Sequence, residues 1–188
     1  LGIRMKSEEV KKLTDPDVKI LFPNPEMRVA VAASVGLIAH LEKEIEGIEA
    51  MITRKIKVRK EFTKLLTMPG IGQILGLTIM LEVGHIDRFP TVGNYSSYCR
   101  CVRSIRTSNG KITGYGNRKS GNKYLSWAYV EAANFARRFH EVVRSYYERK
   151  VARTNRIVAI KAVSHKLARA SYYVMRDNVD YDQARLFG

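Results

Sequence analysis

Apolar and polar positions in the first third of the chain follow a heptad pattern. Asn24 is a predicted N-cap with Pro25 at the first helical position, and no further proline interrupts the chain until well past residue 60. Within 25–60, apolar residues advance by alternating steps of three and four, with one serine in the seam: Val31, Ser34, Ile38, Leu41, Ile45, Ile48 and Ile52. This spacing predicts a long coiled-coil-like helix, packed either on its own domain or on a second chain.

Helical spacing also dominates the rest of the chain. Glu61–Leu66 and Gln73–Val83 are predicted helices on either side of a glycine turn, and a further helix is expected near residues 91–101. A long basic helix is expected over residues 122–150, and a last one over residues 156–176 after a break at 153–155. Their predicted core positions are Leu125, Tyr129, Ala132, Ala136, Phe139, Val143, Tyr147, Ile157, Ile160, Val163, Leu167 and Tyr173.

The polar segment 103–119 is expected to form an exposed loop, with a short hairpin as an alternative, and no longer strand pattern is present. The predicted fold is therefore all-α. Because the chain starts at Leu1 rather than at a methionine, we expect a fragment: a linker at 1–24 that follows a missing N-terminal domain, the coiled-coil helix at 25–60, and a helical, basic domain at 61–188.

Charge separates the two halves of the chain. The whole sequence has a formal net charge of +15, and residues 100–188 hold 19 lysines and arginines against six aspartates and glutamates. Such one-sided charge favours a polyanionic partner, and the basic residues are mixed with Tyr, Ser, Asn and Gly rather than set on one face of an apolar helix. We therefore expect DNA as the partner and not a membrane; no apolar run is long enough to cross a bilayer.

The cysteines do not form a recognisable metal motif. Cys99 and Cys101 are the only two, and their spacing matches no common zinc pattern, while the four histidines are scattered. We expect both thiols to be packing residues in a reducing cytoplasm, and we expect no metal or other cofactor in this chain.

Three short stretches carry the candidate chemistry. Pro69-Gly-Ile-Gly72 resembles the turn of a helix-hairpin-helix, in which the N–H groups of Gly70, Ile71 and Gly72 and the start of the next helix would hold a phosphate. Such turns also serve protein contacts. Near residue 120, Ser120 or Asn122 is the predicted N-cap of the next helix, whose first N–H groups would hold a phosphate together with Lys119 and Lys123. A plain cap has the same geometry. Ser108 is a weak nucleophile by itself, with no histidine or carboxylate within six residues. The cations that would stabilise charge around it are Arg103, Arg106, Lys111, Arg118 and Lys119.

The order of six motifs resembles the C-terminal domain of IS110-type (IS116/IS110/IS902) insertion-sequence transposases. The motifs are MPGIGxxxGLTIMLEVGxIxRF, YSSYxxxVxSxRxSxGK, GNRKSGNKYLxWAxxEAA, SYYxRKxxRT, AIKAVSHKLARASYYVM and VDYD. The resemblance implies a DNA transposase in which Ser108 attacks a phosphodiester and forms a phosphoserine link. It also implies a RuvC-like domain with metal-binding acidic residues, for a divalent metal such as Mg²⁺, outside this chain. The implied partners are DNA, an RNA guide and further copies of the chain through the helix at 25–60, in a bacterial or archaeal cytoplasm.

Two positions depart from the family pattern. Asn109 replaces the glycine that follows the family serine, with Gly110 one place later, and Arg118 replaces a serine or threonine, which leaves Ser120 as a second candidate nucleophile. Two other functions stay open from the residues themselves: a non-catalytic helix-hairpin-helix module that binds nucleic acid, and a coiled-coil oligomerisation protein.

Overall fold

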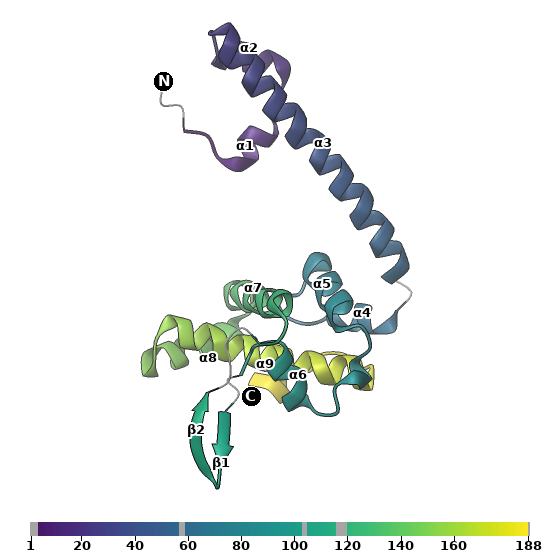
Figure 1. Ribbon diagram of the computed structural model, residues 1–188, viewed down its shortest axis with the longest axis vertical. Helices are drawn as coiled ribbons and strands as arrows, with labels where there is room; N and C mark the ends of the chain where they lie inside the picture. Colours follow the sequence, from purple (N-terminus) through teal and green to yellow (C-terminus); the bar gives the residue numbers. More distant parts are fainter. Residues whose placement is uncertain (1–3, 57–58, 103–104, 116–119, 188) are drawn as a thin grey trace. The chain divides into compact units, whose positions relative to one another are not determined.

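A computed structural model describes residues 4–56, 59–102, 105–115 and 120–187, and the chain divides into two compact units, Leu1–Lys55 and Ile56–Gly188 (Figure 1). The regular secondary structure of the described residues is helical except for one two-stranded sheet, which confirms the all-α prediction. None of the helices in these ranges combines the length and the apolar character needed to cross a membrane.

The first unit is built on one long helix. Helix α1 spans Ser7–Lys11, α2 spans Asp15–Leu21 and α3 spans Pro25–Ile56. Asn24 caps α3 as predicted, because its side-chain oxygen accepts the N–H groups of Glu26 at 2.9 Å and Met27 at 3.2 Å. An ion pair of 2.9 Å joins Lys11 on α1 to Glu42 on α3.

The predicted heptad seam of α3 is largely open within the first unit. Leu41, Ile45 and Ile48 are each about half exposed. Further exposed apolar residues on the same helix are Met27, Val29, Leu37 and Met51. An apolar stripe of this kind is typical of a helix that packs on another helix, so the coiled-coil assignment stays a prediction with a suitable surface.

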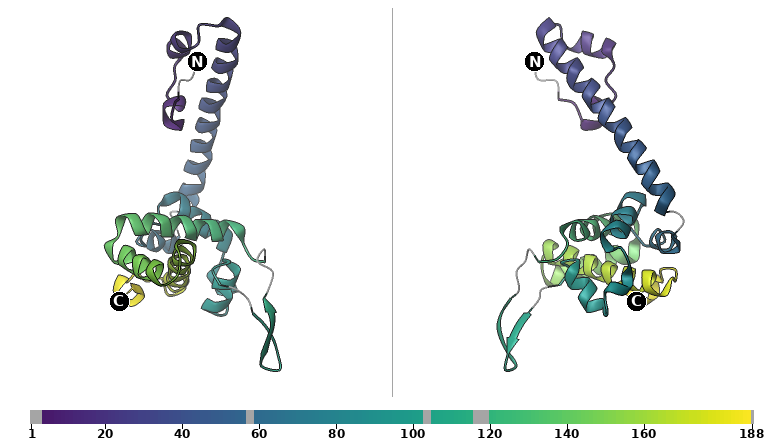
Figure 2. Two further views of the ribbon diagram at one scale, coloured as in Figure 1. Left: turned by 90° about the vertical axis from the view of Figure 1, so that its left-hand side faces the viewer. Right: turned by 45° about the vertical axis from the view of Figure 1, so that its right-hand side comes forward.

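The second unit is a helical bundle that carries one hairpin (Figures 1 and 2). Its elements, in chain order, are α4 (Lys60–Leu65), α5 (Gln73–Val83), the 3₁₀ turn η1 (Ile86–Arg88), α6 (Val92–Tyr98), β1 (Ile105–Ser108), β2 (Lys111–Tyr115), α7 (Lys123–Phe139), α8 (Glu141–Arg153), α9 (Arg156–Asp177) and α10 (Gln183–Phe187). Helix α9 is the centre of this unit, because α4, η1, α6, α7 and α8 all pack against it.

The core around α9 is apolar with one buried chain of hydroxyl groups. The hydroxyl of Tyr129 lies 2.5 Å from the hydroxyl of Tyr95 and 2.5 Å from Oγ of Ser171, which donates to the carbonyl of Ala168. These buried polar groups therefore have partners, as buried hydroxyls need. This row of hydrogen-bonded hydroxyl groups joins α6, α7 and α9. Burial raises the pKa of Tyr95 and that of Tyr129 well above the ordinary value for tyrosine.

The predicted single helix over residues 122–150 was wrong, because it is divided into α7 and α8. His140 has φ −121° and ψ 113°, an extended conformation that ends one helix and starts the next. The break turns Phe139 outward, where 74% of its surface is exposed, so this residue is not part of the core. Ile157, another predicted core position, lies in the first turn of α9 and is 76% exposed.

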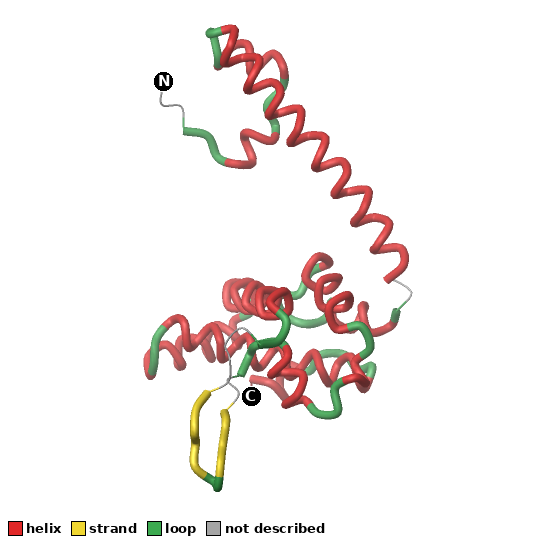
Figure 3. The backbone as a smooth tube through the Cα atoms, in the orientation of Figure 1, coloured by secondary structure: helices red, strands yellow, loops and turns green. Residues whose placement is uncertain are grey.

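The strands form the short hairpin that was the alternative for the 103–119 segment. They pair antiparallel, with Ser108 opposite Lys111 and Ile105 opposite Tyr115. The register shifts between Arg106 and Thr107, so that β2 holds one extra residue. The two strands extend away from the helices in Figure 3, where they are yellow.

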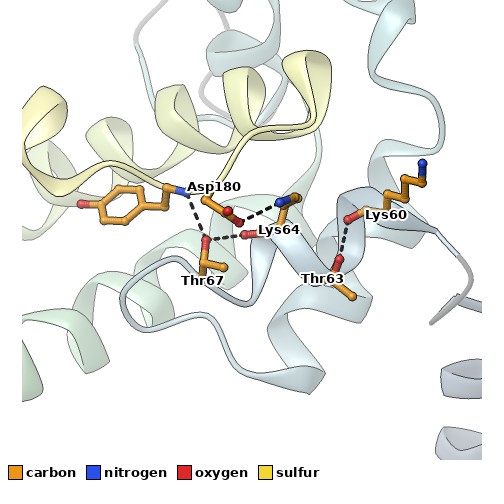
Figure 4. A network of polar contacts seen from close by, with 6 residues as sticks. Lys60, Thr63, Lys64, Thr67 and Asp180 are labelled. Atoms are coloured by element: carbon orange, nitrogen blue, oxygen red, sulfur yellow. Dashed lines mark hydrogen bonds and ion pairs between the residues drawn. The ribbon is translucent and has the colours of Figure 1, made fainter.

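The C-terminal VDYD stretch is fastened to α4 (Figure 4). Asp180 pairs with Nζ of Lys64 at 3.0 Å, and the N–H of Tyr181 donates to Oγ1 of Thr67 at 3.1 Å. Thr67 in turn donates to the carbonyl of Lys64 at 2.7 Å. These contacts hold the chain end against the helix that leads into the glycine turn, which is a structural reason for the motif.

Candidate nucleic-acid interface

The glycine turn joins α4 to α5 and is fixed mainly by apolar burial. Met68, Pro69 and Ile71 are buried, and the N–H of Ile71 donates to the carbonyl of Met68 at 3.2 Å. The side chain of Ile71 therefore belongs to the core, and its N–H is already used within the turn. Of the three turn residues predicted to contact DNA, Ile71 has the least freedom to do so.

The two glycines of the turn face different surroundings. Gly70 has φ +78°, and a Cβ built on it would lie 2.1 Å from the carbonyl oxygen of Ala132 and 2.8 Å from the nitrogen of Ala136. Gly70 is thus the point where the turn touches the backbone of α7. Gly72 is exposed and has nothing within 4 Å of a built Cβ. Only Gly72 leaves the backbone open to a ligand.

The start of α5 has the features of an anion site. Gly72 is its N-cap, no side chain caps the helix, and the first turn holds no acidic residue. The first N–H groups of an α-helix have no partner within the helix and carry partial positive charge. A phosphate next to Gly72 would therefore meet free donors without having to displace a carboxylate.

Ser108 lies at the end of β1, directly before the turn of the hairpin. Asn109 and Gly110 form this turn with φ +50° and +72°, the two positive values that a two-residue hairpin requires and that Asn-Gly favours. Ser108 is exposed, and its hydroxyl makes no hydrogen bond to another described residue, while its backbone belongs to the pairing with Lys111. Its hydroxyl is therefore open to a ligand, and no described base contacts it.

The predicted cations around Ser108 are only partly described. Lys111 is directly opposite Ser108 and is exposed, and directly opposed residues have Cβ atoms about 5 Å apart. Arg106 is paired with Gly114, and its side chain lies outside the described part. Arg103, Arg118 and Lys119 lie outside the described residues.

Asn122 uses its side chain within the protein. Its oxygen accepts the N–H groups of Tyr124 at 2.8 Å and Leu125 at 3.0 Å, which confirms the predicted cap of α7. Its amide nitrogen donates to a carboxylate oxygen of Glu82 at 2.5 Å. These bonds indicate a positioning role, because a phosphate contact through this side chain would have to replace one of them.

The segment before α7 is also fixed to the end of α6. The N–H of Asn122 donates to the carbonyl of Tyr98 at 2.7 Å, and the guanidinium of Arg100 donates twice to the carbonyl of Gly121, at 2.9 and 2.7 Å. Gly121 has φ +92°, and a Cβ there would lie 2.5 Å from the Tyr98 carbonyl oxygen. Lys123, the first residue of α7, is exposed, and its Nζ lies 4.8 Å from the ring centre of its neighbour Tyr124.

Glu82 and Arg100 hold the ends of this loop, and the sequence pattern did not single them out. Glu82 is the only charged residue in α5, whose other members are apolar or uncharged. A single carboxylate within such a helix could have indicated a polar contact, because a charge beside an apolar core is costly unless it has a hydrogen-bonding partner. The partner, Asn122, is 40 residues away along the chain and could not be named from the sequence.

The thiols offer neither a metal site nor a reactive group. Burial raises the pKa of Cys101 to about 12 and that of Cys99 further still, so both are protonated at neutral pH. Within the described ranges, no group of three or more His, Cys, Asp or Glu side chains could hold a metal ion. The divalent metal that the family resemblance implies is expected in a domain outside this chain.

Comparison with known proteins gives two matches. The model of a protein family described as the transposase IS116/IS110/IS902 family matches residues 63–148, from α4 through the hairpin to α8. A curated relative from Streptomyces coelicolor, an uncharacterized 43.6 kDa protein of insertion element IS110, is 22% identical over 155 residues. That alignment covers 82% of this chain but only 38% of the relative. Both matches support the IS110-type transposase family.

Proposed function

We propose that this chain is the serine-bearing, DNA-binding part of an insertion-sequence transposase. The observation that carries the proposal is the position of Ser108: exposed, at the tip of a tight hairpin, and within the residues that match the transposase family. A nucleophile has to reach a phosphorus atom, and an exposed side chain next to the turn of a hairpin that extends away from the helices (Figure 3) is accessible to a DNA backbone.

In the proposed step, Oγ of Ser108 attacks a phosphodiester. A bond forms between Oγ and phosphorus, one P–O ester bond breaks, the serine proton passes to a base, and the departing oxygen takes up a proton. Lys111, opposite Ser108, would stabilise the charge on the five-coordinate phosphorus. The base has to come from outside the described surroundings of Ser108. A second strand that attacks the phosphoserine restores the serine and joins the DNA ends.

DNA is held by two further features. The uncapped start of α5 next to Gly72 would take a phosphate, and Lys123 would contact the backbone beside the cap of α7. Such contacts are independent of base sequence and set the register of the duplex on the protein. The choice of target is then left to other factors, and we propose an RNA guide among them.

Self-association through α3 would bring several serines together. Leu41, Ile45 and Ile48 lie at successive seam positions and remain about half exposed in the first unit. Strand exchange requires more than one nucleophile, so a coiled coil between copies would serve the reaction as well as the assembly. We place the acidic residues that hold a divalent metal in a part of the parent protein beyond this chain.

The test uses the parent protein with Ser108→Ala. Incubation with labelled DNA that carries element ends, followed by a denaturing gel, is expected to show a covalent protein–DNA band for the unchanged protein and none for this variant. Ser120→Ala, which removes the second candidate hydroxyl, and Ser97→Ala, which removes another exposed serine, serve as matched controls and should retain the band.

Two results would reject the role of Ser108. A band that persists in Ser108→Ala excludes it as the nucleophile, and loss of the band in Ser120→Ala alone transfers the role to that residue. DNA binding by the unchanged protein without any covalent adduct would instead favour a non-catalytic nucleic-acid-binding module.

A further inference from the structure

A basic cleft lies between α8, α9 and α10, apart from the elements that carry Ser108 and the glycine turn. It has a volume of about 300 Å³ and is lined by Tyr146, Arg149, Lys150, Arg153, Lys166 and Phe187. Four of these six residues are cations, and no carboxylate is among them. The volume is at the lower end of the range for sites that bind small groups.

The cations on α8 form one face of that helix. Arg149, Lys150 and Arg153 follow Tyr146 at steps of three, four and seven residues, the spacing that aligns side chains along a helix. None of the ion pairs between described residues includes these three cations. Like charges three and four residues apart destabilise a helix, so this face is suited to an anion that is supplied from outside.

Lys166 enters the same cleft from α9 and is held in place. Its ammonium donates to the carbonyl of Leu186 and lies 4.9 Å from the ring centre of Tyr146 and 5.2 Å from that of Phe187. The two rings contact each other edge to face, with centres 5.4 Å apart. Burial, together with the nearby charge of Arg169, lowers the pKa of Lys166, as expected for a cation without a carboxylate partner.

A helix dipole explains only part of this cluster. Cations in the last turn of α8 interact favourably with its C-terminal carbonyl groups, which accounts for Lys150 and Arg153. The dipole does not account for Lys166, which comes from the middle of another helix, nor for the way Phe187 closes over it. Convergence of cations from two helices on one cleft is what an anion site requires.

We propose that this cleft binds successive phosphate groups of a nucleic-acid backbone, as a contact separate from the hairpin and the glycine turn. Nucleic acid is favoured over an acidic protein segment because its phosphates follow one another at regular spacing, which suits a row of cations along α8. The basic character of residues 100–188, with 19 cationic against six acidic residues, points to the same partner. This inference goes beyond the proposed function, because it holds whether or not Ser108 is a nucleophile.

The test measures nucleic-acid affinity of the 188-residue chain against salt. Arg149→Gln, Lys150→Gln and Arg153→Gln are combined in one variant, and binding to a short labelled DNA duplex and to RNA of the same sequence is followed by fluorescence anisotropy. Each lost phosphate contact on duplex DNA lowers the slope of log K against log salt by about 0.9. The variant should therefore show a slope smaller by about 2–3 units on the polymer that uses the cleft.

The matched control removes the same charge elsewhere. Lys12→Gln, Lys19→Gln and Lys43→Gln are exposed positions in the first unit, and their combination should retain the slope. Phe187→Ala leaves the charge unchanged but frees Lys166, and it should weaken binding at low salt while the helical circular dichroism stays unchanged. All of these variants keep Ser108, so their results are independent of the test of the nucleophile.

Three outcomes would overturn the proposal. An unchanged slope for the cleft variant on both polymers would exclude a phosphate contact there. An equal decrease of the slope in the control variant would show that binding depends only on the net charge of the chain. If the cleft variant binds nucleic acid as the unchanged chain does but no longer binds a labelled polyglutamate peptide, the cleft would be assigned to an acidic protein partner.

Discussion

Replacing Gly70 by alanine should destabilise the second unit more than the same substitution at Gly72 or Gly110. Alanine at φ +78° carries a left-handed strain of about 1–2 kcal/mol. The new methyl group would also lie 2.1 Å from the carbonyl oxygen of Ala132 and 2.8 Å from the nitrogen of Ala136. Both contacts are with the backbone of α7 at two buried positions, which cannot rotate away, and overpacking of this kind costs about 1–3 kcal/mol. The expected total is about 2–5 kcal/mol.

A loss of this size is a large fraction of the stability of a small domain, which is about 5–15 kcal/mol. It corresponds to a fall in melting temperature on the order of 10 °C. The chain has a single tryptophan, Trp127 on α7, so tryptophan fluorescence during thermal or urea unfolding reports on the second unit alone.

Alanine substitutions at two other glycines distinguish the cost of backbone strain from the cost of the steric contact. Gly72→Ala meets nothing within 4 Å and has an ordinary backbone, so it should change the melting temperature by no more than a few degrees. Gly110→Ala has φ +72° in open space and should show the conformational strain without the clash. If Gly70→Ala unfolds at the same urea concentration as Gly72→Ala, the turn does not touch α7 as described, and the reasoning fails.

Three further predictions concern the cap, a histidine and the thiols. Asn122→Ala should lower stability by about 1 kcal/mol through loss of the helix cap, measured by urea unfolding, whereas Asn122→Ser can cap the helix without placing a second carboxylate beside Glu82 and should lose less; an alanine variant as stable as the unchanged protein would contradict this role. Burial, with Arg169 nearby, lowers the pKa of His165 below its ordinary value of about 6.5, so the unfolded state binds more protons and stability should fall as the pH drops below that value. His165→Gln should reduce this acid-side loss in melts at pH 7 and pH 5, and an equal loss in both proteins would refute the assignment. Cys99 and Cys101 should resist alkylation by iodoacetamide at pH 8 in the folded chain and react after denaturation, as followed by mass spectrometry; rapid labelling of the folded chain would show that they are accessible thiolates.

Local signals were enough for the helices and their caps. Asn24 and Asn122 cap helices where the sequence predicted, and Gln73–Val83 is a helix with Gly84 after its last residue. Capping depends on residues two or three places apart, so the sequence contains all the information needed. The short hairpin was only the alternative expectation for its segment, although Asn109-Gly110 is a local signal for it, since few other dipeptides accept two positive φ values.

Patterns failed where one periodicity covered two elements. The helical spacing of apolar residues runs through Phe139 and His140 without interruption, although the chain turns there and Phe139 faces solvent. Periodicity records which residues could share a face but not whether the axis continues, because a change in backbone direction needs only one extended residue. Neighbouring helices decide whether such a turn is favourable.

The sequence by itself determined the helical class, the caps, the tight turn next to Ser108 and the unequal distribution of charge, because each depends on residue type or on neighbours within one or two turns. The tertiary structure alone decided which groups meet across the fold. Gly70 contacts α7, Glu82 accepts a hydrogen bond from the side-chain amide of Asn122, and Lys166 lies in one cleft with the cations of α8. These contacts join residues 13 to 66 positions apart along the chain, and only packing around the central helix brings them together.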